Sequence, residues 1–197
     1  MGGAQSMMPY ARFCALACLL ALWFTGLAQA STLGEQLKQP GYALLMRHAL
    51  APGTGDPAGF RLGDCSTQRN LDAAGRQQAV RTGGWLREQG VVNALVFTSP
   101  WCRCRDTAAL LGLGEPELEF VLSSFFDDPE RAPKSLLGLQ QRLVQLNQRK
   151  GDKALVLVTH HVNILGYMGE NVGSGDMVLV RFDAQGKLLQ AQRYASP

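Results

Sequence analysis

The sequence contains little charge and very little histidine. Charged residues make up 18% of its 197 residues, only three are histidine, and the net charge is +3 with histidine neutral. A chain that is 46% hydrophobic with so few charges is not typical of disorder and can bury one core. Its basic residues form no cluster, so the composition gives no support for a nucleic-acid partner. There is no internal repeat or long linker, and the length predicts a single domain.

Charge is almost absent from the first thirty residues, where Arg12 is the only charged side chain. The apolar run from Phe13 to Leu27 is shorter than the roughly 20 residues that a membrane span needs. It ends in Ala28-Gln29-Ala30, small residues at the spacing that signal peptidase recognises. We therefore predict a signal peptide over residues 1–30 and a periplasmic or secreted domain over 31–197, with no stable membrane span after removal of the signal. A retained N-terminal anchor is the alternative.

Cysteine is also scarce, and two of the five cysteines lie in the predicted signal. In an oxidising compartment the remaining three, Cys65, Cys102 and Cys104, permit one disulfide and leave one thiol. Cys102 and Cys104 are poorly placed to bridge each other within one element. We expect Cys65–Cys102 first and Cys65–Cys104 second, and three unpaired cysteines are the remaining alternative.

Short apolar runs alternate with segments of helical periodicity after residue 31. Apolar strands are predicted at Tyr42–Met46, Ala94–Phe97 and Ala154–Val158, a further strand at Leu118–Leu122, helices at Leu71–Gln89, Trp101–Leu113 and Leu136–Leu146, loops at Ala49–Gly63 and Ser123–Pro133, and a closing hairpin at Met177–Phe182 and Lys187–Tyr194. This order predicts an α/β fold with three layers, a mostly parallel central sheet with helices on both faces. Ligands of such sheets bind beyond the carboxyl ends of the strands.

All three histidines follow predicted strands, and arginines accompany them. Arg47-His48 ends the first strand, Arg103 follows the second, and His160-His161 ends the last strand before the hairpin. Arginine offers a planar fork of donors that matches phosphate oxygens. A neutral imidazole can attack phosphorus and form a covalent intermediate. The pattern therefore predicts a phosphoryl-transfer site at this edge of the sheet, without a metal or other cofactor.

Four segments of the chain resemble motifs of the histidine phosphatase superfamily, and they occur in the family's order. They are Leu44–Ala49, similar to its Arg-His-Gly signature; Leu71–Ala79, similar to its Leu-Thr-x-x-Gly-x-x-Gln-Ala helix start; Ser99–Ala108, similar to its Ser-Pro-x-x-Arg-x-x-x-Thr-Ala segment; and Val158–His160, similar to its second-histidine strand end. The resemblance implies the phosphoglycerate-mutase-like fold.

The resemblance also implies roles for particular residues. His48 would be the nucleophile that becomes phosphohistidine, Arg47 and Arg103 would bind the phosphoryl oxygens, and His160 would stabilise the transferring group. Arg105 and Asp106 fall outside the family's pocket positions, so we interpret them as residues of a solvated helix face.

The general acid is left open among several side chains. Larger members of the family place a carboxylate in the loop after the third strand, where this chain has Asp127 and Asp128, or directly after the second histidine, where it has His161. We favour Asp127. No acid at all is needed if the leaving group is already good. Thr54 and Asp56 are further candidates for contact with substrate.

The predicted function is that of an exported phosphatase that acts on a small phosphomonoester. The chain most resembles small exported members of the family such as lipopolysaccharide-core heptose-phosphate phosphatases, which implies a sugar phosphate of the cell envelope as substrate. One alternative is an inactive phosphate- or sugar-phosphate-binding protein on the same fold. Another is a metal-binding module that uses His48, His160, His161 and a cysteine.

Overall fold

The computed structural model describes residues 1–3 and 31–197, so the predicted signal peptide lies almost wholly outside the described residues. The elements are α2 (Leu33–Lys38), β1 (Tyr42–Arg47), η1 (Cys65–Thr67), α3 (Ala73–Glu88), β2 (Ala94–Thr98), α4 (Cys102–Leu111), β3 (Glu117–Leu118), η2 (Phe120–Leu122), η3 (Pro129–Arg131), α5 (Ala132–Lys150), β4 (Ala154–Thr159), α6 (His161–Met168), β5 (Met177–Phe182) and β6 (Leu188–Tyr194), where η marks a 3-10 helix. None of the helices in this described part is long and apolar enough to cross a membrane.

One six-stranded sheet, in the order β3-β2-β4-β1-β5-β6, organises residues 31–197. The strands β3, β2, β4 and β1 are parallel, and β5 and β6 extend the sheet as an antiparallel hairpin beside β1. This arrangement confirms the predicted α/β fold with a mostly parallel sheet. It places the carboxyl ends of β1, β2 and β4 at one edge, because neighbouring parallel strands run in the same direction.

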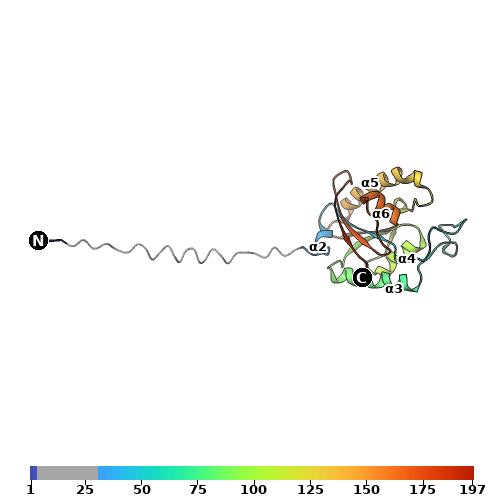
Figure 1. The fold of residues 1–197 in the computed structure, drawn as a ribbon, viewed down its shortest axis with the longest axis horizontal. Helices are drawn as coiled ribbons and strands as arrows, with labels where there is room; N and C mark the ends of the chain where they lie inside the picture. Colours follow the sequence, from blue (N-terminus) through green and yellow to red (C-terminus); the bar gives the residue numbers. More distant parts are fainter. Residues whose placement is uncertain (4–30) are drawn as a thin grey trace. The chain divides into compact units, whose positions relative to one another are not determined.

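Helices cover both faces of the sheet and bury two separate apolar cores (Figure 1). On one face, α2, α3 and α4 pack over inward side chains such as Leu44 and Met46. On the other, α5 and α6 pack over Ala43 and Leu45, the alternate residues of the same strand. Because successive strand side chains point to opposite faces, a strand buried on both sides must be apolar throughout. This explains the unbroken apolar run of β1.

The predicted third strand at Leu118–Leu122 is wrong over most of its length. The chain pairs with β2 only at Glu117 and Leu118 and then turns into the 3-10 helix η2. Leu122 is fully buried, whereas Phe120 is exposed. A longer edge strand needs buried and exposed side chains in alternation, and this segment has one buried side chain among exposed ones, so the strand ends early.

Candidate active site

The sheet topology brings the two predicted catalytic histidines together. His48 directly follows β1 and His160 directly follows β4, and these two strands are neighbours. The backbone N–H of His48 donates to the carbonyl of Thr159 at 3.0 Å, which extends the strand pairing to the site. The two imidazole centroids lie 5.6 Å apart, with the rings inclined at 69°. Both side chains are almost fully buried.

A backbone contact fixes the state of the His48 ring. Its Nδ1 lies 2.8 Å from the carbonyl oxygen of Ala49, which can only accept a hydrogen bond, so Nδ1 carries the hydrogen. Burial lowers the pKa of His48 to about 3, with smaller effects from the charges of Arg103, Arg47 and Arg69, although the Ala49 contact opposes the shift. The ring is therefore neutral near pH 7, and its Nε2 has a free lone pair.

His160 is held by residues from the connection between β2 and α4 and from α4 itself. Its Nε2 lies 2.8 Å from the hydroxyl of Ser99 and 3.5 Å from the sulfur of Cys104, and the Trp101 ring packs edge-on against it. Burial, with the nearby His48 and arginines, holds the pKa of His160 well below its usual value. Burial also raises the pKa of the Cys104 thiol to about 12, so this cysteine stays protonated.

The first turn of α4 supplies Arg103, which is locked by a buried carboxylate. Its Nη1 donates to both oxygens of Asp56, at 2.8 and 3.1 Å, and the two side chains are 4% and 2% exposed. Asp56 also accepts from the Trp101 indole and from the backbone N–H of Arg69, both at 3.0 Å. Burial alone would raise the pKa of Asp56, but these hydrogen bonds and the Arg103 charge lower it overall. Asp56 is therefore an ionised partner of Arg103.

A third arginine, Arg69, lies in the same pocket, and the sequence analysis did not identify it. Its Nε donates to the carbonyl of Gly55 at 2.7 Å, and its Nη1 donates to that of Ala51. Arg69 stands in the connection between η1 and α3, where no periodicity or motif marks it. Only the folding of the loop over the pocket brings it beside Arg103.

Two buried arginine nitrogens in the pocket have no hydrogen-bond partner within residues 31–197. They are the Nε atoms of Arg47 and Arg103. The Nη1 of Arg47 donates to the carbonyl of Val172 at 2.9 Å, which orients the guanidinium group. A buried donor without a partner is costly, so an anion with several acceptor oxygens would be stabilised here.

A disulfide joins Cys65 of η1 to Cys102, the first residue of α4, with the Cα atoms 5.7 Å apart. This is the first of the pairings considered from the sequence, and Cys104 is a free, buried cysteine. The neighbouring Gln68 accepts a hydrogen bond from the backbone N–H of Cys102 at 3.0 Å. The disulfide thus attaches the loop that carries Arg69 to the helix turn that carries Arg103.

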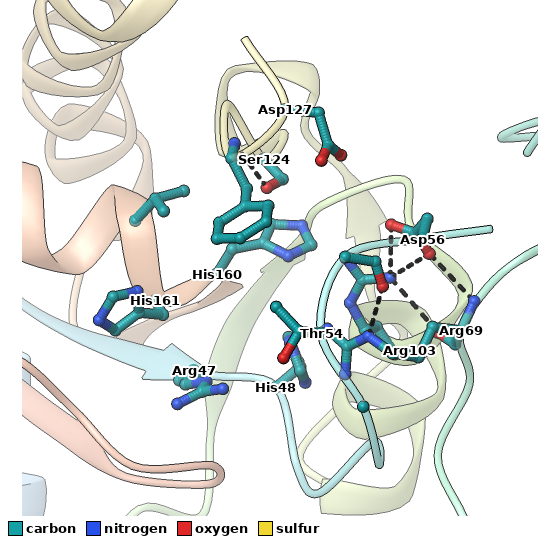
Figure 2. Close-up of a pocket in the computed structure, with 14 residues that line it drawn as sticks. Arg47, His48, Thr54, Asp56, Arg69, Arg103, Ser124, Asp127, His160 and His161 are labelled. Atoms are coloured by element: carbon teal, nitrogen blue, oxygen red, sulfur yellow. Dashed lines mark hydrogen bonds and ion pairs between the residues drawn. The ribbon is translucent and has the colours of Figure 1, made fainter. Parts of the chain in front are cut away.

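The outer part of the pocket is formed by side chains from three segments (Figure 2). The full lining consists of Arg47, His48, Gly53, Thr54, Gly55, Asp56, Arg69, Arg103, Ser124, Phe126, Asp127, His160, His161 and Val162. Asp128 is not among these residues; it is exposed, and its carboxylate lies 3.8 Å from Arg131. Of the candidate acids, the structure therefore places Asp127 and His161 at the pocket and Asp128 outside it.

His161 and the two residues assigned to a helix face are each held by a polar partner. The Nε2 of His161 lies 2.5 Å from the amide oxygen of Asn171. Asp106 forms an exposed ion pair with Arg76 at 2.6 Å, and Arg105 is exposed on the same helix as Asp106 and does not line the pocket that contains Arg47, Arg69 and Arg103. No group of three or more metal-ligating side chains occurs within the described ranges.

Comparison with known proteins agrees with this arrangement. The model of the histidine phosphatase superfamily (branch 1) matches residues 43–128, which include Arg47, His48 and Arg103. No curated protein sequence matches the chain significantly.

Similar solved structures share the fold at low identity. A structure of the protein histidine phosphatase SixA with tungstate is 19% identical, with a TM-score of 0.55, and the match covers 79% of this chain and 97% of that one. Phosphoserine phosphatase from Entamoeba histolytica with 3-phosphoglyceric acid is 16% identical, with a TM-score of 0.57 and coverages of 75% and 93%. Mycobacterial glucosyl-3-phosphoglycerate phosphatase with VO3 is 15% identical, with a TM-score of 0.58 and coverages of 79% and 99%. The chain therefore carries the sequence signature and the phosphoglycerate-mutase-like fold of the histidine phosphatase superfamily.

Proposed function

We propose that this protein is a phosphatase that hydrolyses a small phosphomonoester through a phosphohistidine intermediate on His48. The observation that carries the proposal is the pair of buried, unpartnered Nε donors of Arg47 and Arg103 beside a neutral His48. Two guanidinium groups would bind the phosphoryl oxygens, and Nε2 of His48 has the lone pair that attack on phosphorus requires. Arg69 would add a third positive charge.

The reaction would have two steps. In the first, Nε2 of His48 forms a bond to phosphorus while the ester P–O bond breaks, and Asp127 gives a proton to the departing alkoxide oxygen. In the second, water attacks phosphorus and gives a proton to the Asp127 carboxylate, the P–N bond breaks, and inorganic phosphate leaves with neutral His48 and protonated Asp127 restored. His160 would stabilise the charge on the phosphoryl oxygens during both transfers. Asp127 lines the pocket, as a general acid must.

Hydrolysis of para-nitrophenyl phosphate, with and without EDTA, tests the proposal. Turnover that resists EDTA and disappears in His48→Ala is expected, together with an acid-labile, base-stable phosphate label on His48 after quenching. Full activity in His48→Ala would contradict the mechanism. A protein that binds phosphate but shows no turnover would be the inactive binding protein, and loss of activity in EDTA with recovery in zinc would favour the metal-binding alternative.

Matched variants test the supporting residues. Arg103→Lys should reduce kcat/KM strongly because lysine lacks the planar donor fork, whereas Arg105→Lys, two residues along the same helix, should not. Asp127→Asn should remove the limb of the pH profile that depends on the acid, whereas Asp128→Asn should leave the profile unchanged. If both carboxylate variants keep this limb of the pH profile, the acid is His161 or the reaction needs no acid.

We also propose that the protein is exported and acts on a sugar phosphate of the cell envelope. The support for export is the apolar N-terminal sequence and a disulfide, which persists in oxidising compartments. Cell fractionation and N-terminal sequencing test it, since cleavage after Ala30 would give a mature protein that begins at Ser31. A cytoplasmic protein that retains Met1 would refute the proposal.

A further inference from the structure

The outer part of the active-site pocket has no arginine or lysine side chain within the described residues. We define this outer part by the six lining side chains beyond the arginines, Asp56, His48 and His160, all of them exposed or half-buried: Thr54, Ser124, Phe126, Asp127, His161 and Val162. Asp127 is the acidic side chain among them, and it is exposed. The part of the substrate that remains after the phosphoryl group is placed must lie against these residues, because the inner part is occupied by the two histidines and three arginines (Figure 2).

The inner part provides no spare positive charge for a second anionic group. It contains the guanidinium groups of Arg47, Arg69 and Arg103 and the buried carboxylate of Asp56. Two positive charges therefore remain, and a phosphoryl dianion neutralises both. A carboxylate on the leaving group would lack a cationic partner and would meet Asp127.

Phe126 and Asp127 lie side by side at the pocket opening. A Cβ atom placed on Gly55 would be 3.9 Å from both the Phe126 ring and a carboxylate oxygen of Asp127. Gly55 has a φ of 69°, in the left-handed region, and belongs to the turn that carries Thr54. Phe126 is 48% exposed although it lines the pocket, so its ring offers apolar surface that a bound molecule would cover.

We propose that the leaving group of the substrate carries no negative charge and packs a carbon face against Phe126. This inference rests on the proposed phosphatase activity and narrows its substrates to esters of uncharged alcohols, such as polyols, sugars or phenols. Phosphorylated carboxylic acids are excluded as good substrates, because their carboxylate would lack a cationic partner and would lie beside Asp127, which is negatively charged whenever it does not hold the proton that the first step transfers.

Two three-carbon esters test the charge argument directly. Glycerol 3-phosphate and 3-phosphoglycerate differ at one terminal carbon, which is a hydroxymethyl group in the first and a carboxylate in the second. Each is measured as a competitor of phenyl phosphate hydrolysis, so each gives an inhibition constant whether or not it is itself hydrolysed. We expect glycerol 3-phosphate to compete at least about tenfold better, and tenfold corresponds to about 1.4 kcal/mol. Equal competition, or better competition by 3-phosphoglycerate, would overturn the inference and leave the proposed phosphatase activity standing.

Variants at the pocket opening separate charge from catalysis. Asp127→Asn should reduce the preference for glycerol 3-phosphate, whereas loss of a general acid alone would slow every substrate and leave the competition ratio unchanged. Asp128→Asn, which alters a carboxylate outside the pocket, should not change the ratio. Phe126→Ala should raise the KM of phenyl phosphate severalfold more than it raises the inhibition constant of glycerol 3-phosphate. Phe120 is an exposed phenylalanine outside the pocket, so Phe120→Ala should change neither constant. An unchanged ratio in Asp127→Asn would refute the role of its charge, and failure to hydrolyse phenyl phosphate at all would refute the proposed function itself.

Discussion

Replacement of Asp56 by asparagine tests whether one buried carboxylate holds Arg103, the arginine that we propose binds phosphate, in place. In the folded protein both oxygens of Asp56 accept from Nη1 of Arg103, and the pair is almost completely shielded from water. Asp56→Asn keeps the size of the side chain and one oxygen acceptor. It removes the negative charge and puts an NH2 group where Arg103 needs an acceptor.

The magnitude follows from the burial of the pair. Removing one partner of a buried ion pair costs about 3–5 kcal/mol, because the remaining charge is left without compensation. The oxygen that asparagine retains places the expected loss in the free energy of unfolding near the lower limit, at about 3 kcal/mol. Arg103 would also lose the contact that orients its guanidinium group, so we expect kcat/KM to fall at least about tenfold.

Urea unfolding curves measure the stability change, and inhibition by inorganic phosphate, recorded well below the unfolding midpoint, reports on the arginine. The inhibition constant of phosphate should rise in Asp56→Asn. A smaller folded fraction alone would lower the activity but would not change this constant. Asp64→Asn is the matched control, because Asp64 lies in the same loop but forms an exposed pair with Arg61. Wild-type stability and phosphate inhibition in Asp56→Asn would refute the reasoning.

Three other perturbations have expected outcomes. Reduction of the Cys65–Cys102 disulfide, which closes a loop of sequence separation 37, should lower the free energy of unfolding by about 4 kcal/mol in urea curves, and an unchanged midpoint would contradict this. Gly75→Ala should destabilise the protein by about 1–3 kcal/mol, because the new Cβ would lie 1.9 Å from a backbone carbonyl oxygen, whereas Gly84→Ala on the same helix, where the nearest atom to the new Cβ is a side-chain nitrogen at 4.0 Å, should not. The pKa of His48, about 3 when folded, is below its unfolded value, so the unfolded state binds more protons between pH 3 and 6.5. Stability should therefore fall on acidification below pH 6.5, by up to about 1.4 kcal/mol per pH unit, and more gently in His48→Gln.

Several features of the fold could be predicted because local patterns encode them. The runs Tyr42–Met46 and Ala154–Val158 are apolar at every position, which is possible only for strands covered on both faces. The predicted closing hairpin is also present, with β5 and β6 joined by a turn at residues 183–186. The third strand was the exception, since its length depended on pairing at the sheet edge rather than on its own sequence.

The residues of the candidate site also include some that the sequence predicts and some that it does not. Arg47, His48, Arg103 and His160 could be selected from their positions at strand ends and from family motifs. Arg69 and the role of Asp56 could not, because both lie in an irregular, glycine-rich loop whose course is set by long-range contacts. The choice between Asp127 and Asp128 likewise depended on which side chain of adjacent residues lines the pocket.

The sequence by itself determined most of the strands and longer helices, the class of fold and the histidines and arginines available for phosphate chemistry, because these follow from periodicity and from residue type. Only the tertiary structure decided the protonation state of His48, the pairing of Arg103 with Asp56 and the position of Arg69 in the pocket. Those properties depend on burial and on hydrogen bonds between segments far apart in the chain. A local pattern contains no information about such contacts until the sheet brings the segments together.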